Sequence, residues 1–144
     1  MCSLYWNGKD RNKTKIVDIL NLYSLNVRGL QGAQKTKKVF NWLQKFDKGI
    51  ILLQETHTSQ LDEKSWLNQW KSPIFFSHGS TNSRGVSIIL PKALKENCSL
   101  HYKDSEGRIL IGKFYIKTAK ISKNPQLRNF YFNARKVFYS PKGC

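Results

Sequence analysis

The sequence predicts an α/β fold, because a segment with helical periodicity lies between two short apolar strands. The first strand is expected at residues 20–25, which are mainly apolar and lead into a turn-forming stretch at 26–29. Residues 34–46 carry apolar side chains at helical spacing and lysines on the other side, which predicts an amphipathic helix. An unbroken apolar run at 50–53 predicts a strand that is buried on both faces. A strand, a helix and a strand in this order are typical of a βαβ unit with parallel strands.

Three parts are distinguished along the chain. Residues 1–19 form a polar and basic lead-in, residues 20–116 a domain, and residues 117–144 a basic tail. The remaining predicted elements of the domain are a short helix around Trp66, Leu67 and Trp70, strands at 73–76 and 86–90, and a hairpin of residues 100–102 and 109–115 across the turn at 104–107. No acidic residue occurs after Glu106. The tail is either a nucleic-acid-binding segment or sequence outside the ancestral fold, and we favour the second interpretation.

The composition favours a partner that is rich in phosphate. The 144 residues are 40% hydrophobic, enough for one domain with a real core, and carry a formal net charge of +16. Nucleic acid is the first candidate, although a basic surface also suits anionic membranes, ribosomes or simple solubility. Cys2, Cys98 and Cys144 show no metal-binding spacing, so we expect free thiols. Without a signal-like or membrane-spanning run, the chain is expected to be soluble and intracellular.

Two polar residues follow directly after predicted strands, Asn26 after the first and Glu55 after the second. The carboxyl ends of parallel strands meet at the same edge of a sheet, where open α/β sheets bind their ligands. An ionised Glu at such a place needs a partner, and Mg²⁺ commonly takes one or two carboxylates and fills its other positions with water and phosphate. The plainer alternative is that Glu55 forms a surface salt bridge and that Asn26 only makes the turn.

Four motifs carry a resemblance to a known family. They are Leu-Asn-Val-Arg-Gly-Leu at 25–30, Leu-Gln-Glu-Thr-His at 53–57, Ser-Arg-Gly-Val-Ser-Ile-Ile-Leu at 83–90 and Glu-Gly-Arg at 106–108. In this order they resemble the endonuclease/exonuclease/phosphatase superfamily and, within it, the apurinic-type endonuclease of LINE-type (non-LTR) retrotransposons. The resemblance covers about residues 20–116. It implies the amino-terminal half of a four-layer α/β sandwich, with mixed sheets and outer helices, of which we expect this chain to supply one sheet.

The resemblance also implies an activity and a set of site residues. The family cleaves DNA phosphodiesters with Mg²⁺, the residue matching Glu55 binds the metal, and the residue matching Asn26 lies beside it in the active site. Arg28, His57 and Arg108 are expected to contact nucleic acid, although His57 could be an ordinary surface histidine and Arg108 could serve strand packing. A DNA substrate would place the protein in the nucleus.

The family's later motifs have no clear counterpart in this sequence. These are Tyr-Ala-Pro-Asn, Gly-Asp-x-Asn and a late Ser-Asp-His, which supply the group that activates water, further metal contacts and the general base. Asp10-Arg11-Asn12 precedes the first strand, the wrong place in the chain, and Tyr139-Ser140-Pro141 is at most a degenerate match. We therefore expect a truncated endonuclease domain that is inactive alone. The alternative from another class is a non-enzymatic basic module that binds nucleic acid.

Overall fold

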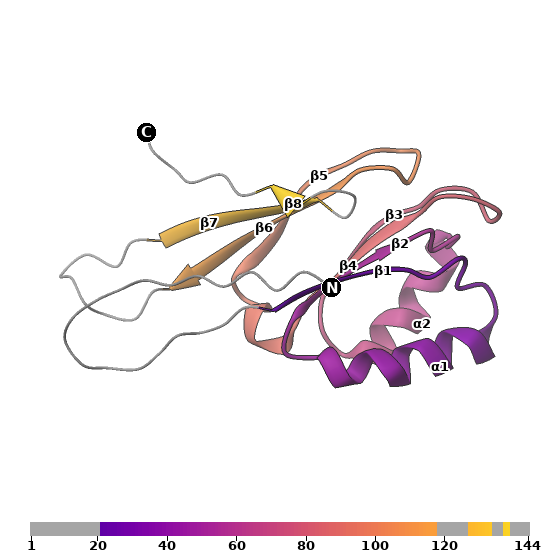
Figure 1. Ribbon diagram of the computed structural model, residues 1–144. Helices are drawn as coiled ribbons and strands as arrows, with labels where there is room; N and C mark the ends of the chain where they lie inside the picture. The colour runs from indigo at the N-terminus through magenta and orange to yellow at the C-terminus, as the bar shows by residue number, and fades with distance from the viewer. Residues whose placement is uncertain (1–20, 118–126, 134–136, 139–144) are drawn as a thin grey trace.

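The computed structural model describes residues 21–117, 127–133 and 137–138 (Figure 1). The elements are, in chain order, β1 (Leu22–Asn26), α1 (Ala33–Leu43), the 3₁₀-helix η1 (Gln44–Phe46), β2 (Ile50–Gln54), α2 (Gln60–Trp70), β3 (Ile74–Ser77), β4 (Val86–Ile89), the 3₁₀-helix η2 (Lys92–Leu94), β5 (Cys98–Lys103), β6 (Leu110–Lys117), β7 (Leu127–Asn133) and β8 (Val137–Phe138). The predicted α/β class is confirmed. The Asp10-Arg11-Asn12 and Tyr139-Ser140-Pro141 motifs lie outside the described residues.

The strands form two four-stranded sheets, whereas the sequence predicted one. The first sheet has the order β1-β2-β4-β3, and its β1 and β2 are parallel, as predicted for the βαβ unit. The second sheet has the order β5-β6-β7-β8 and is antiparallel throughout. The predicted hairpin exists as β5 and β6, but it packs on the face of the first sheet. It does so because Ile88 and Leu52 on that face need an apolar cover, which Leu110 and Phe114 provide.

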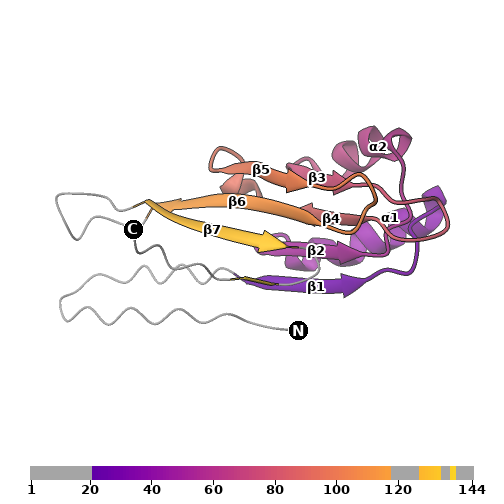
Figure 2. The same cartoon turned by 90° about the horizontal axis from the view of Figure 1, so that it is seen from above.

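The first sheet is the middle layer of the molecule, with the helices on one face and the second sheet on the other (Figures 1 and 2). β2 shows this most clearly, because Ile50 and Leu52 belong to the core between the sheets and Ile51 and Leu53 to the core beneath the helices. All four side chains are at most 1% exposed. This alternation confirms the predicted strand buried on both faces.

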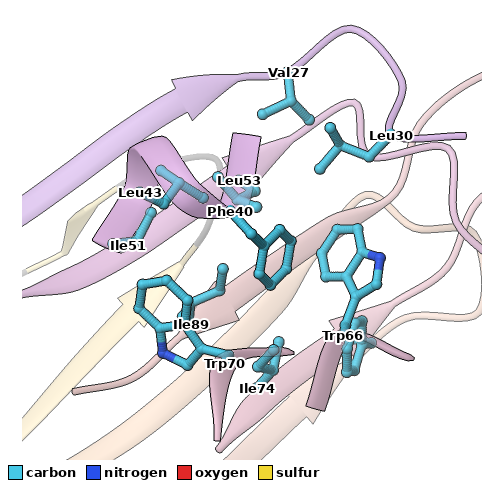
Figure 3. Close-up of a cluster of buried hydrophobic side chains, with 11 residues drawn as sticks. Val27, Leu30, Phe40, Leu43, Ile51, Leu53, Trp66, Trp70, Ile74 and Ile89 are labelled. Carbon is cyan, nitrogen blue, oxygen red and sulfur yellow. The ribbon is translucent and has the colours of Figure 1, made fainter. Parts of the chain in front are cut away.

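Aromatic side chains from both helices pack together in the core beneath the helices (Figure 3). Phe40 of α1 lies between Trp66 and Trp70 of α2, with ring centroids 4.9 and 5.9 Å away in edge-on arrangements. The indole N–H of Trp70 donates to the carbonyl of Leu90 at 3.1 Å, so this polar atom is satisfied in the core. α2 is longer than the two tryptophans suggested, because Ser59 and Asp62 form a capping box that fixes its start.

The second sheet continues into residues that the sequence assigned to a basic tail. β7 pairs with β6 from Ile111↔Asn133 to Lys117↔Leu127. Part of the segment 117–144 therefore extends the sheet, and the domain boundary at 116/117 stays a prediction. In the described part of the chain, no helix is long and apolar enough to cross a membrane. Cys98 is a free thiol, whereas Cys2 and Cys144, for which free thiols were also expected, lie outside the described residues.

Asp104 joins the two sheets at the turn between β5 and β6. The Ser77 hydroxyl at the end of β3 lies 2.8 Å from the Asp104 carboxylate, which also accepts the backbone N–H groups of Arg108 and Ile109 at 3.0 and 2.9 Å. Partial burial tends to raise the pKa of Asp104. The hydrogen bonds from Ile109, Ser77 and Arg108 outweigh this effect and hold the pKa below its ordinary value.

We predict that Asp104→Asn lowers the free energy of unfolding by about 1 kcal/mol at neutral pH, the size expected of partly solvated hydrogen bonds to a charge. Because the folded-state pKa is depressed, this contribution is fully present above the ordinary Asp pKa of about 3.9 and disappears as the pH falls through the lower folded value. Urea denaturation between neutral and acidic pH measures the difference. Asp47→Asn, at an exposed carboxyl, is the control. A difference between wild type and Asp104→Asn that does not change with pH would contradict this assignment.

Candidate active site at the carboxyl edge of the first sheet

Asn26 and Glu55 both lie at the carboxyl edge of the first sheet. In the parallel pairing of β1 and β2, Asn26 is opposite Gln54, and Glu55 directly follows the end of β2. The side-chain oxygen of Asn26 accepts the backbone N–H of Arg28 at 3.0 Å, which closes a turn directly after β1. Asn26 therefore makes the turn, as the plainer interpretation held, and its amide NH₂ is the group that can donate to a ligand.

The carboxylate of Glu55 receives two hydrogen bonds on one oxygen. Its Oε2 accepts the backbone N–H of Arg84 at 2.9 Å and lies 3.1 Å from Nε2 of His57. A neutral histidine that donates through Nε2 satisfies this contact. The Glu55 side chain is 36% exposed, so it is held in place and still accessible from solvent. The alternative that Glu55 serves in a surface salt bridge stays open beside a metal-binding role.

Backbone hydrogen bonds join the loops around Glu55. Gly29 N–H donates to Glu55 O at 2.6 Å, and Leu30 N–H donates to Thr56 O at 2.8 Å. On the other side, the N–H groups of Thr56 and His57 donate to Gly85 and Arg84 at 3.1 and 2.9 Å. The loops after β1, after β2 and before β4 thus continue the sheet pairing beyond the ends of the strands.

The same loops contain an unusual number of left-handed backbone conformations. Arg28, Glu55, His57 and Arg84 have φ values of 47°, 53°, 54° and 68°. Such residues cost about 1–3 kcal/mol each and persist only where the surroundings impose them, which here are the hydrogen bonds between the loops. Gly85 has φ 89°, and a Cβ at this position would collide with Thr56 Oγ1. Glycine is therefore required for the close approach of the two loops.

A chain of side-chain hydrogen bonds supports the Glu55 loop from behind. Thr56 Oγ1 and Thr58 Oγ1 are 3.1 Å apart, Thr58 Oγ1 lies 3.1 Å from His78 Nδ1, and His78 Nε2 lies 2.8 Å from Glu63 Oε1. Both threonines are at most 1% exposed. Sequence reasoning missed this chain, because its members come from a loop, a helix and a strand end that no spacing rule connects. The only local signal is that two polar threonines flank a histidine directly after an apolar strand.

The predicted nucleic-acid contacts have different environments. The His57 ring lies on the Glu55 carboxylate and is 20% exposed, so its visible role is to hold Glu55. The Arg108 guanidinium pairs with Glu106 at 3.1 Å, and Glu106 also pairs with Arg84. Arg28 is exposed in the turn after β1. The structure thus brings Glu55, His57 and Arg84 into direct contact, and sequence reasoning had not selected Arg84.

The Glu55 carboxylate is the group at this edge that suits a divalent cation. Asn26 supplies an amide at the end of the neighbouring strand. Among the described residues there is no cluster of three or more His, Cys, Asp or Glu side chains that could enclose a metal ion. The arrangement therefore suits a cation that takes one protein carboxylate and completes its octahedron with water and phosphate, as Mg²⁺ does. Hydrogen bonds from Arg84 and His57 are the kind of support that orients a metal-binding carboxylate.

Comparison with known proteins identifies the family of this chain. The sequence profile of the Endonuclease/Exonuclease/phosphatase family matches residues 20–136, which is most of the chain. The uncharacterized 149 kDa protein of transposon TX1 from Xenopus laevis is 26% identical over 112 residues. That alignment covers 78% of this chain but 8% of the transposon protein, so the chain spans a small part of this relative. The transposon relative supports the resemblance to LINE-type retrotransposon endonucleases. With its profile match over most of its length, the chain belongs to the endonuclease/exonuclease/phosphatase family.

Proposed function

We propose that the carboxyl edge of the first sheet is the metal-binding part of a Mg²⁺-dependent active site that cleaves DNA phosphodiester bonds. The observation that carries this proposal is the Glu55 carboxylate, which is accessible to solvent and fixed by the Arg84 N–H and the His57 imidazole. An isolated surface carboxylate would not need two donors and four left-handed loop residues to hold it.

Each residue of the edge has a role in this proposal. Glu55 would hold the Mg²⁺, and a bound Mg²⁺ supplies positive charge that neutralises the phosphodiester and lowers the pKa of coordinated water. The Asn26 amide donates to a phosphate oxygen or to a coordinated water without adding negative charge beside the substrate. His57 orients the Glu55 carboxylate, and Arg28 and Arg108 contact the DNA backbone.

The chain as it stands supplies only part of the catalytic machinery. Cleavage of a phosphodiester by water also needs a group that positions and deprotonates the water, and the family's Gly-Asp-x-Asn and Ser-Asp-His motifs are absent from this sequence. Positioning and general-base catalysis each contribute orders of magnitude to a rate. We therefore propose that this chain does not cleave DNA by itself.

Binding of Mg²⁺ tests the metal role of Glu55 without requiring turnover. In two-dimensional ¹H–¹⁵N NMR spectra, Mg²⁺ should shift the amide signals of Arg84 and His57. The Arg84 N–H is bonded to the Glu55 carboxylate, and the His57 ring contacts the same oxygen. Glu55→Gln keeps the shape of the side chain and should abolish these shifts. Glu96→Gln, which removes an exposed acid elsewhere, should leave them unchanged. The same Mg²⁺-dependent shifts in Glu55→Gln would show that the cation binds elsewhere.

A nicking assay tests the proposed inactivity. Supercoiled plasmid incubated with the chain and Mg²⁺ should show no nicking above the protein-free background, because the water-activating groups are absent. Glu55→Ala identifies contamination, since a contaminating nuclease is indifferent to this change. Nicking by the wild-type chain that disappears in Glu55→Ala would contradict the proposal and would mean that the described edge is sufficient for catalysis.

A non-enzymatic basic module is the second candidate function, and a specific observation favours it. The net charge is +16, and Lys35, Lys37 and Lys38 are exposed together on α1. Such a surface binds nucleic acid through phosphate contacts, with affinity that comes largely from counterion release and little sequence preference. No metal is needed for this function.

Fluorescence anisotropy with a short labelled DNA duplex separates the two functions. If the chain is a basic module, binding in EDTA should weaken steeply with salt, Lys37→Gln/Lys38→Gln should weaken it further, and Glu55→Gln should leave it equal or slightly tighter. Circular dichroism first establishes that each variant is folded. Binding that ignores salt, or that is lost in Glu55→Gln and kept in the lysine variant, would contradict the basic module.

A further inference from the structure

Two arginines beside the candidate site share one carboxylate oxygen. Oε2 of Glu106 lies 3.3 Å from a terminal nitrogen of Arg84 and 3.1 Å from a terminal nitrogen of Arg108. The three side chains are 42%, 48% and 55% exposed for Arg84, Arg108 and Glu106. Two guanidinium groups thus converge on a single point that solvent reaches.

The two arginines hold the Glu106 carboxylate only weakly. Exposed ion pairs contribute about 0–1 kcal/mol each, because water and salt screen them. The group carries two positive charges and one negative charge, so it retains a net positive charge with the carboxylate in place. A phosphate offers more acceptor oxygens than the one that Glu106 uses here, and guanidinium–phosphate contacts are among the stronger charge-assisted hydrogen bonds.

The backbone holds both arginines in fixed positions. Arg84 N–H is bonded to Glu55 Oε2, and Gly85 N–H donates to Gly107 O at 3.0 Å, which joins the two arginine-bearing loops. Arg108 N–H is bonded to the Asp104 carboxylate. The backbones of both arginines are therefore fixed beside the Glu55 loop, and the contact with Glu106 brings their guanidinium groups together there.

We propose that Arg84 and Arg108 form a phosphate clamp for the nucleic-acid backbone and that Glu106 occupies the clamp until a phosphate displaces it. This inference rests on the proposed function for its ligand, since the clamp would grip the strand whose phosphodiester meets Glu55. Glu106 lowers the affinity of the free clamp for anions and keeps the two guanidinium groups together in the absence of nucleic acid.

Removing the negative charge of Glu106 tests the proposal. Glu106→Gln should bind a short labelled DNA duplex more tightly than the wild-type chain in EDTA, because the phosphate no longer has to displace a carboxylate. The slope of log affinity against log salt should change little, because the wild-type complex makes the same phosphate contact. Asp47→Asn is the matched control, because it removes the same charge from an exposed position at the opposite end of β2. Glu106→Gln should exceed this control, and Arg84→Gln/Glu106→Gln should lose the gain.

Each other outcome overturns a defined part of the proposal. Equal affinity of Glu106→Gln and Asp47→Asn would mean that net charge alone acts, and weaker binding by Glu106→Gln would mean that Glu106 only orients the arginines. A gain that survives in Arg84→Gln/Glu106→Gln would remove Arg84 from the clamp. Tighter saturation by inorganic phosphate than by DNA would contradict the assignment to nucleic acid. Because EDTA removes divalent metal, failure here leaves the Mg²⁺ proposal for Glu55 standing, and failure of the Mg²⁺ test leaves the clamp standing.

Discussion

The hydrogen bonds to one oxygen of Glu55 are the constraint on which the candidate site depends. Arg84 N–H and His57 reach this oxygen only because both residues have left-handed backbones and because Gly85 lets their loops approach. A carboxylate that must keep one orientation in contact with water needs such support, since hydration alone leaves it free to rotate. The concentration of left-handed residues at this edge supports the proposal that the edge binds a ligand, because a turn between two strands does not require so many unfavourable conformations.

Periodicity in the sequence was sufficient to predict β2, the strand beside it and the helix that covers one of its faces. The helical spacing of Phe40 and Leu43 and the apolar run of β2 have few alternative explanations, so α1, the parallel β1–β2 pair and the polar edge beyond it followed. The second sheet was not predicted, because the pattern of β5 and β6 defines a hairpin but not the partner on which it packs. His57 could not be assigned to Glu55 either, since two residues so close in sequence make this contact only through unusual φ values.

The charges of this chain act in two ways, at long range through the overall excess and at short range through individual side chains. The overall excess of +16 attracts any polyanion at long range, which governs the rate of encounter and the dependence on salt. At short range, Glu55, Asp104 and Glu106 are acidic groups among these basic loops, and each accepts hydrogen bonds or ion pairs from Arg84 or Arg108. In the proposed site, these carboxylates and their donors would position a phosphodiester, whereas the exposed lysines would add affinity without fixing its position.

A crystal structure of the chain with Mn²⁺ would test the metal role of Glu55 most directly, because Mn²⁺ prefers the same oxygen ligands as Mg²⁺ and is located by its anomalous scattering. We predict an anomalous peak about 2.1 Å from the Glu55 carboxylate, the usual bonding distance for such a cation, with the Arg84 N–H still bonded to Oε2. An ordered Glu55 loop with the hydrogen bonds from Arg84 and His57 intact, and a peak bound only elsewhere, would contradict the assignment of this edge as a metal site.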